Sequence, residues 1–334
     1  MKTDISRNTF DPRRRYRGVR QQQGRILTDA DWNEQLDAAG YQARIAARDT
    51  VGPTGVPRDQ PGFEVRAAVD PANGDASTLS IGAGRMYVDG LLCESFQDRL
   101  VTAQRDLPGP GLPVVDGDFL AYLEVRSRAV TALEDAAIRE IALGGIESSS
   151  REQTLAQVKL LEITNANHDP RGRPPEWEAL LATPRGRLTA RTIADGVAAN
   201  PCDLAARGGY NGTDNRLYRI EIHRGGVPGT ATYKWSATNA TLVTEWLAQA
   251  SANTLQIRGP GRDRTQSFAA GQWIEIDDEG LELVRRPGTL ARITQVDEQS
   301  ITIDPETLIH SDPASAALNI NDFSRGVRRI RRWD

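Results

Sequence analysis

One amphipathic helix is the first element that the pattern of apolar residues predicts. Residues 28–50, "TDADWNEQLDAAGYQARIAARDT", carry a narrow apolar stripe at helical intervals of three and four: Trp32, Leu36, Ala39, Ala43 and Ala46. Thr28 and Asp31 have the spacing of a helix start, in which the hydroxyl accepts a backbone amide hydrogen bond. Glycines and prolines after residue 51 end the helix. We expect a rod of about 20 residues and roughly 30 Å.

Beyond residue 62 the apolar residues recur at intervals of two, the period of β-strands. Residues 78–95 predict hairpins with a tight turn at Asp89-Gly90, and residues 116–133 predict a strand. Residues 151–164 fit neither the helical nor the strand period cleanly, and of the two alternatives we favour a strand. The clearest alternation is "NRLYRIEIHRGG", which places His223 on the polar phase. Residues 134–143 can form a short helix, and so can "EWEALLA" within a turn-rich excursion near residues 165–200.

A series of short strands near the C-terminus predicts a small β-barrel. The five segments are "TLQIRG", "WIEIDD", "LELVRR", "LARITQVD" and "SITID", and closure would remove their exposed edges. The predicted fold class is mainly β (α+β), with antiparallel central sheets. We expect a basic arm (1–27), a docking helix (28–50), a central β region (62–250), a barrel-like module (251–306) and a basic tail (307–334).

The overall charge and the absence of long apolar runs restrict the class of protein. Forty-one Lys and Arg against 45 Asp and Glu give a net charge of -4, which argues against a general nucleic-acid binder. No apolar run suits a secretion signal or a membrane span. We therefore expect a soluble protein that assembles in the cytoplasm without a Sec signal, with an extracellular location after cell lysis left open. Cys93 and Cys202 permit one disulfide.

Charge is concentrated at the two ends of the chain, next to two tryptophans. Arginine favours bidentate pairing across interfaces, and tryptophan is a common interface anchor. Between the basic ends, the acidic run "EIDDEGLE" (275–282) is interpreted as a solvated turn, with a calcium site or a glycosidase pair as alternatives. The interface candidates are Arg13, Arg14, Arg15, Arg17, Arg20, Trp32, Leu36, Arg328, Arg329, Arg331, Arg332 and Trp333.

No motif in the sequence predicts catalytic chemistry. His168, His223 and His310 are far apart, and neither a zinc-protease motif, a nucleophile elbow nor a phosphate-binding loop occurs. We expect His223 to be exposed on its strand and His168 to lie in a turn. The remaining strand tryptophans are interpreted as core residues, with a sugar-binding platform as the alternative: Trp235, Trp246 and Trp273. The sequence predicts no catalytic, cofactor-binding or metal-binding residue.

Several long segments resemble a bacterial family of unassigned biochemical function, whose members lie in gene clusters of contractile, phage-tail-like injection systems. The matching segments are "SRNTFDPRRRYRGVRQQQGRILTDADWNEQLD", "YLEVRSRAVTALEDAAIREIALGG", "LYRIEIHRGG", "YKWSATNATLVT" and "VRRIRRWD". The chain differs from that pattern at Arg126-Ser127, and it stops where many relatives continue, which favours a compact adaptor. The resemblance implies a part of the baseplate or fibre end.

These observations lead to a function as an expectation. The chain would be a non-enzymatic structural subunit that assembles through its arm and helix. Its partners would be other copies of itself, as a trimer or six-fold ring, and other injection-system subunits, without nucleic acid and without membrane insertion. A carbohydrate-binding or glycan-hydrolysing protein associated with the tail is the alternative.

Overall fold

The chain forms two compact units in a computed structural model. The first comprises Met1–Val115, Ala121–Leu160 and Arg216–Asp334, and the second comprises Asp116–Leu120 and Leu161–Asn215. The structure describes residues 2–69, 76–107, 109, 117–164, 169, 172–182, 189, 217–227, 229–261, 266–311, 315 and 317–334. Most of the predicted excursion and two predicted features, His168 and Cys202, lie outside the described residues.

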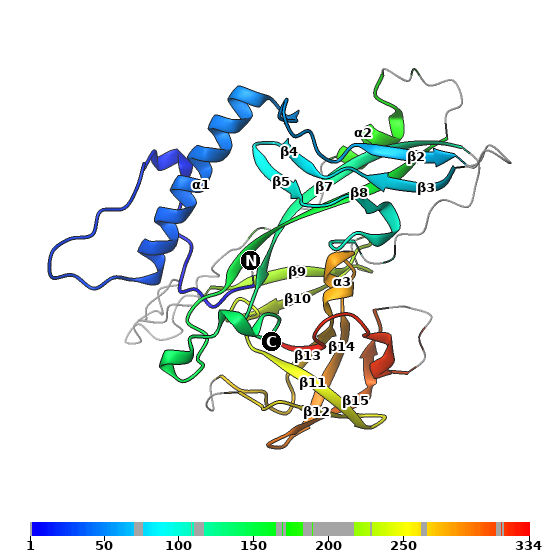
Figure 1. Cartoon of the computed structure of the whole chain (residues 1–334). Helices are drawn as coiled ribbons and strands as arrows, with labels where there is room; N and C mark the ends of the chain where they lie inside the picture. The colour runs from blue at the N-terminus through cyan, green and yellow to red at the C-terminus, as the bar shows by residue number, and fades with distance from the viewer. Residues whose placement is uncertain are drawn as a thin grey trace, which may run out of the picture. The chain divides into compact units, whose positions relative to one another are not determined.

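The predicted helix is present as α1, Asp29–Val51 (Figure 1). Thr28 caps it as expected, because its hydroxyl accepts a hydrogen bond from the Asp31 amide at 3.2 Å. The helix ends at Gly52, whose amide donates to the Arg48 carbonyl at 2.8 Å and whose φ of 91° suits glycine. A short 3-10 turn, η1 (Pro12–Arg14), lies in the arm that precedes α1.

Short antiparallel sheets follow the helix. The first sheet has the strand order β1-β4-β5 and the second β2-β3-β6. The predicted turn joins β4 to β5, with Asp89 at φ 49° and Gly90 at φ 80°. The strands are β1 (Thr54–Gly55), β2 (Val65–Val69), β3 (Ala76–Ile81), β4 (Gly84–Val88), β5 (Leu91–Ser95) and β6 (Arg99–Leu100), with the 3-10 turn η2 (Val101–Ala103) after them.

Two long strands pair in the middle of the chain, and both lie where a strand was expected. They are β7 (Asp118–Val130) and β8 (Arg151–Ile163). The segment between them, for which a short helix was considered, instead forms two 3-10 turns, η3 (Ala136–Ile138) and η4 (Ile141–Leu143). The short helix predicted at "EWEALLA" is α2, Pro175–Leu181, in the second unit.

In the described part of the chain, six antiparallel strands close into a barrel with the order β11-β12-β15-β14-β13-β16. This confirms the predicted mainly β class and the barrel-like module. Isoleucines from several strands fill its interior, and Trp246 lies edge-on to Phe323 at a ring-centroid distance of 5.7 Å. The strands are β11 (Val243–Ser251), β12 (Thr254–Ile257), β13 (Trp273–Asp277), β14 (Thr289–Val296), β15 (Ser300–Ile309) and β16 (Arg329–Trp333).

The barrel differs from the prediction in three places. "LELVRR" is not a strand, because Asp278 caps the helical turn α3 (Glu279–Leu283) by accepting from the Leu281 amide at 2.9 Å. The predicted basic tail is wrong, since β16 is a barrel strand that pairs with both β11 and β13. The barrel therefore runs from Val243 to Trp333 rather than over 251–306, and the 3-10 turn η5 (Ile320–Asp322) precedes its last strand.

A two-stranded hairpin, β9 (Arg219–Arg224) and β10 (Thr232–Ser236), precedes the barrel in the chain and contacts its last strand. The amide of Asp334 donates to the carbonyl of Trp235 at 2.9 Å, and the carboxylate of Asp334 accepts from the Ala237 amide at 2.8 Å. These hydrogen bonds place one face of the hairpin over the outside of β13 and β16.

Candidate functional site

The apolar stripe of α1 faces solvent. Trp32 and Leu36 are 60% and 57% exposed, and the alanines of the stripe are exposed as well. The buried residues of α1 are Ala30 and Ala38. At about 100° per residue, the stripe lies roughly opposite that buried side of the helix. Two large apolar side chains of this 23-residue helix, Trp32 and Leu36, thus leave more than half of their surface exposed.

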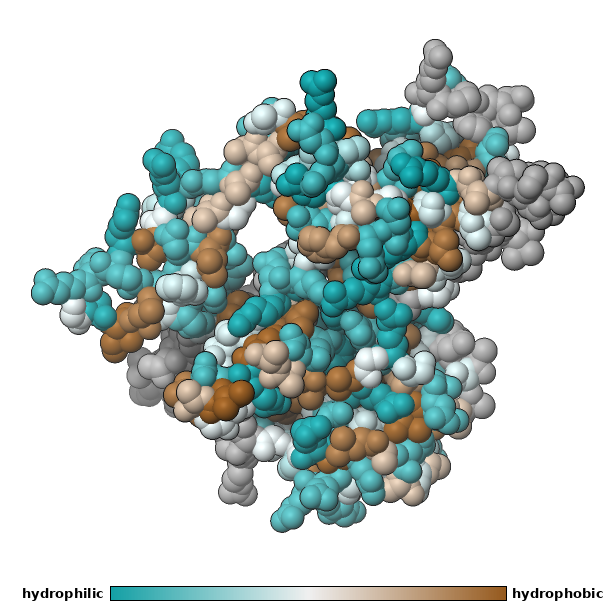
Figure 2. All heavy atoms as spheres, in the orientation of Figure 1, coloured by the Kyte–Doolittle hydropathy of each residue, from teal (hydrophilic) through white to brown (hydrophobic). Residues whose placement is uncertain are grey.

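The N-terminal arm runs beside α1 and is fixed to it by hydrogen bonds. The backbone amide and hydroxyl of Ser6 each donate to Asp29 at 2.8 Å, and the Val19 amide donates to Gln35 at 2.8 Å. The five arm arginines named as candidates are exposed, and Arg13 alone among them is paired, with Asp11 at 3.0 Å, within the described residues. Figure 2 shows hydrophobic residues interspersed with hydrophilic ones over this region. Tyr16, Ile26 and Leu27 of the arm are exposed.

A turn of the β-region anchors α1. Arg44 donates from Nε to the Asp89 carbonyl at 3.0 Å and pairs with its carboxylate, and Arg48 pairs with that carboxylate at 3.1 Å. A Cβ at Gly90 would lie 2.1 Å from the Arg44 carbonyl oxygen, so the helix backbone sits directly on this glycine. We call residues 2–51, the arm and α1 together, the docking element.

The C-terminal candidates are in a different environment. Arg329, Arg331 and Arg332 are 4%, 7% and 7% exposed, and Trp333 is 1% exposed, while Arg328 is half-buried and donates to the Phe323 carbonyl at 2.7 Å. The expectation that these side chains face a neighbouring subunit is therefore wrong for the four buried ones. They belong to β16, whose two faces are both covered.

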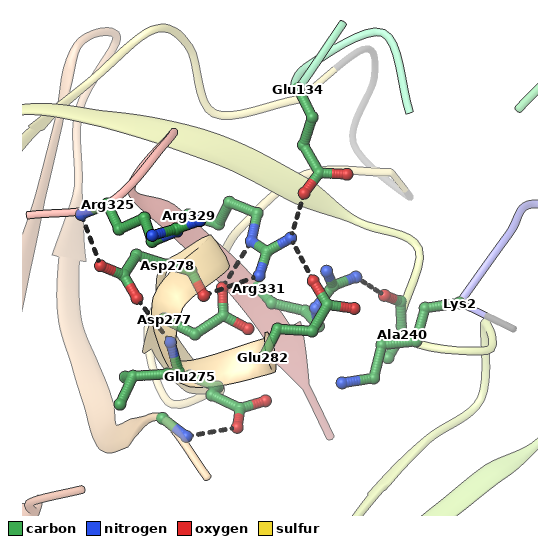
Figure 3. Close-up of polar contacts among 12 residues, drawn as sticks. Lys2, Glu134, Ala240, Glu275, Asp277, Asp278, Glu282, Arg325, Arg329 and Arg331 are labelled. Carbon is green, nitrogen blue, oxygen red and sulfur yellow. Dashed lines mark hydrogen bonds and ion pairs between the residues drawn. The ribbon is translucent and has the colours of Figure 1, made fainter. Parts of the chain in front are cut away.

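The alternation of β16 and β13 explains this burial. Ile330 and Ile276 are register partners that point into the barrel, whereas Arg329 lies opposite Asp277 on the outer face and Arg331 lies opposite Glu275. The β9–β10 hairpin and residues of β7 cover this outer face, so its charges are buried. We call the resulting cluster the charge layer: Arg128, Glu134, Lys234, Glu275, Asp277, Glu282, Arg329 and Arg331. Figure 3 labels its members Glu134, Glu275, Asp277, Glu282, Arg329 and Arg331.

Ion pairs within the charge layer are short. Arg329 donates to Asp277 at 2.7 Å, to Glu134 at 2.7 Å and to Glu282 at 2.8 Å. Burial raises the pKa of Arg329's carboxylate neighbour Glu134, whereas three carboxylates together raise the pKa of the Arg329 guanidinium despite its burial. A buried charge is tolerated only when it is paired and hydrogen-bonded, which this geometry provides.

The acidic run "EIDDEGLE" is part of the same layer, so its interpretation as a solvated turn is wrong. Glu275 accepts from the Lys234 ammonium, from the Trp333 indole at 3.0 Å and from the Gly288 amide at 2.9 Å. Burial alone would raise the pKa of Glu275, but the charges of Lys234 and Lys2 and the hydrogen bonds from Lys234 and Gly288 together outweigh that effect and lower the pKa. Glu279 accepts from Arg128 at 2.9 Å. These carboxylates are engaged in structural contacts.

The β9–β10 hairpin has its polar face inside and its apolar face outside. His223 is 4% exposed, contrary to the expectation of an exposed residue, and its Nε2 donates to the Gly288 carbonyl at 3.0 Å. Trp235, expected in the core, is 40% exposed and stacks on Tyr218 at a ring-centroid distance of 6.5 Å. Trp246 is in the barrel core as expected, and Trp273 is half-buried. The exposed apolar residues of this face are Tyr218, Ile220, Ile222, Tyr233 and Trp235.

Three further observations concern other kinds of site. No group of three or more His, Cys, Asp or Glu residues in the described part of the chain could hold a metal ion. Cys93 is a free, buried cysteine whose thiol pKa is raised to about 11 by burial. Among the described residues, no helix is long and apolar enough to cross a membrane.

Comparison with known proteins identifies a family. A search of curated proteins finds no match, and neither does a search of solved structures. One family model, described as a family of unknown function (DUF6519), matches residues 1–172 and 178–334. Because that match covers nearly the whole sequence, the chain belongs to the DUF6519 family of unknown function.

Proposed function

We propose that this chain is a non-enzymatic structural subunit of a contractile, phage-tail-like injection apparatus, which it joins through the docking element. The observation that carries the proposal is the outward-facing stripe of α1, with Trp32 and Leu36 exposed on a helix anchored through its opposite side. A helix of this kind binds partner surfaces through residues three and four positions apart. The link to an injection apparatus rests on the resemblance of the segments quoted above.

The chemistry of the docking element indicates how it would bind. Alanines along the rest of the stripe allow close approach of a second helix, and the exposed arm arginines attract acidic surfaces and fix orientation. The same element on every copy would bind in the same way, so a closed ring follows naturally. We propose a trimer or a six-fold ring of this chain within the particle, which assembles in the cytoplasm.

The test is the double substitution Trp32→Ala with Leu36→Ala. Both side chains are exposed, so the body should keep its far-UV spectrum and melting temperature while incorporation into the assembly falls at least tenfold. The measurement is the amount of tagged protein that sediments with particles from the native host. Ile141→Ala, which removes an apolar residue that is 86% exposed on another segment, is the matched control. Normal incorporation of the double variant would refute assembly through the helix.

The exposed face of the β9–β10 hairpin favours carbohydrate binding as a second candidate. Tyr218, Tyr233 and Trp235 are 61%, 68% and 40% exposed, and Tyr218 and Trp235 stack with an interplanar angle of 18°. Aromatic faces of this kind are apolar and bind the C–H faces of sugar rings. Saturable quenching of tryptophan fluorescence by a glycan, abolished by Trp235→Ala but kept in Trp32→Ala, would support it. The carbohydrate-binding candidate would be refuted if no glycan on an array bound the protein and no glycan quenched its fluorescence.

A further inference from the structure

A cavity of about 240 Å³ lies at the charge layer, within the first unit. Its lining includes Ser127 and Ala129 of β7, Val243 of β11 and Thr131, but most of it is charged. Two carboxylates, Glu134 and Glu282, line it against six cationic side chains: Lys2, Arg126, Arg128, Arg219, Arg329 and Arg331. The positive side chains therefore outnumber the negative ones at the wall of this cavity.

Both carboxylates of the lining already form ion pairs with arginines of the lining. Glu134 and Glu282 both pair with Arg329, at 2.7 and 2.8 Å, and Arg128 lies 3.1 Å from Glu134. Three carboxylates that do not line the cavity pair with cations that do: Asp277 with Arg329, Glu279 with Arg128, and Glu221 with both Arg219 and Lys2. Two cations of the lining remain to be accounted for.

Arg126 and Arg331 have no carboxylate partner among the described residues. Arg126 donates only from Nη2, to the carbonyls of Glu282 and Leu283 at 2.8 Å, and Arg331 donates from Nη1 to the Ala240 carbonyl. The Nε atoms of both are buried without a hydrogen-bond partner in the described structure, and Arg331 as a whole is only 7% exposed. A buried guanidinium without a counter-ion is costly, and an unsatisfied N–H adds to that cost.

The electrostatics of neighbouring groups agree with this geometry. The pKa of Lys2 is lowered first by its burial and then by the charge of Arg331. Burial lowers the pKa of Arg126 as well; the charges of Glu282 and Glu124 oppose this decrease without cancelling it, and Arg285 and Arg128 add repulsion. The burial of both cations therefore favours additional negative charge beside them.

We propose that this cavity binds a small tetrahedral oxyanion of the phosphate type, which accepts hydrogen bonds from Arg126 and Arg331. Arginine suits such a ligand because its planar guanidinium presents several donors to oxyanion oxygens. At about 240 Å³ the cavity is smaller than the pockets of drug-sized ligands, which begin at about 300 Å³, so it suits a small anion. Arg126 lies on β7 and Arg331 on β16, so the anion bridges the long strand to the barrel and stabilises their contact.

The test uses the full chain and inorganic phosphate as the probe. Isothermal titration calorimetry at pH 7.5 in chloride buffer should show one saturable site with a Kd in the millimolar range or tighter. Sulfate should compete, and phosphate should raise the melting temperature more than chloride does at equal ionic strength. The absence of saturable phosphate binding would overturn the proposal.

Substitution at the rim locates the site without disturbing the fold. Ser127 lines the cavity yet is exposed, so Ser127→Glu places a carboxylate at the cavity and should weaken phosphate binding at least tenfold, while its neutral match Ser127→Gln should not. Arg331→Gln should also lose binding, whereas Arg332→Gln, a buried arginine of the same strand that does not line the cavity, should retain it. Phosphate binding that Ser127→Glu leaves unchanged would place the anion elsewhere and refute this site.

Discussion

Single residues in this protein are best understood through the charge layer. A β-strand directs alternate side chains to opposite faces: in β13 and β16, Ile274, Ile276 and Ile330 point into the barrel, whereas Glu275, Asp277, Arg329 and Arg331 lie on the outer face. The hairpin helps to bury this outer face, since Lys234 reaches Glu275 and lies 4.6 Å above the centre of the Trp333 ring. These ion pairs fix how the hairpin is placed against the barrel.

Removing one partner of a buried pair should be costly. In Glu275→Gln the Lys234 ammonium, 6% exposed at its side chain, loses its closest carboxylate and retains Glu221 at 3.5 Å. We expect the free energy of unfolding to fall by about 3 kcal/mol, because the buried ammonium loses its closest counter-charge and keeps only the more distant one. Urea unfolding at pH 7 measures this. Glu298→Gln, at an exposed turn, should change stability by less than about 0.5 kcal/mol, and an equally small effect of Glu275→Gln would contradict the account.

Stability should decrease in acid with a defined sign. The pKa values of Glu221, Glu275 and Glu282 lie below their usual 4.5, because nearby cations outweigh the effect of burial. Carboxylates with a lowered folded-state pKa stabilise the fold fully above the unfolded value, and this contribution is lost as the pH falls below it. Glu134, whose pKa burial raises, opposes this trend as a single group. The melting temperature should therefore fall steeply below pH 4.5.

The variant Glu275→Gln separates this effect from general acid unfolding. It lacks one of the titrating groups, so its melting temperature should fall less steeply with decreasing pH than that of the wild type. Parallel pH profiles measured by differential scanning calorimetry would show that Glu275 does not carry the assigned linkage.

The sequence predicted the environment of single residues poorly where charge was buried. From the sequence we expected solvent exposure for Arg329, Arg331 and the acidic run, because charged side chains are normally exposed. Arg329 and Arg331 are instead buried. Burial here depends on the hairpin covering the outer face of the barrel, a contact between strands that are distant in sequence. The same contact reverses the exposed and buried faces of β9, so that His223 is buried and Ile222 is 67% exposed.

At the scale of elements, α1 was predicted well. Its cap, its end and its stripe follow from local chemistry, which a sequence displays directly. The stripe was expected to dock, and Trp32 and Leu36 are exposed in the structure. By contrast, "LELVRR" alternates like a strand but follows the capping residue Asp278, and the cap determines its conformation as α3.

The anchor of α1 gives a prediction at this scale. Gly90→Ala would place a methyl group 2.1 Å from the Arg44 carbonyl oxygen at a residue with a positive φ. The contact between α1 and the β4–β5 turn should therefore be disrupted. Amide hydrogen exchange in α1 should become faster by tenfold or more while the barrel strands keep their protection.

A second glycine supplies the control for that experiment. Gly40 lies within α1, and a methyl group added to it would meet no described atom within 4 Å, so Gly40→Ala should slow exchange by raising helix propensity. If Gly90→Ala left the exchange of α1 unchanged, the turn would not be the anchor of the helix.

At the scale of the whole molecule, the sequence indicated a β-rich chain with a barrel near its C-terminus, and the structure has both. It missed that the final strand closes the barrel, because five arginines and a tryptophan among the last residues do not resemble a buried strand. The basic ends of the chain thus have separate roles: the N-terminal arginines are exposed, whereas those of β16 are mostly internal.

We propose that this chain is a built-in part of a larger particle. Affinity purification of the tagged protein, expressed at its native level in its own host, tests this when it is followed by electron microscopy and mass spectrometry of the purified material. We expect sheathed particles that contain an inner tube, with the tag at one end. A free oligomer that is absent from such particles would refute the proposal.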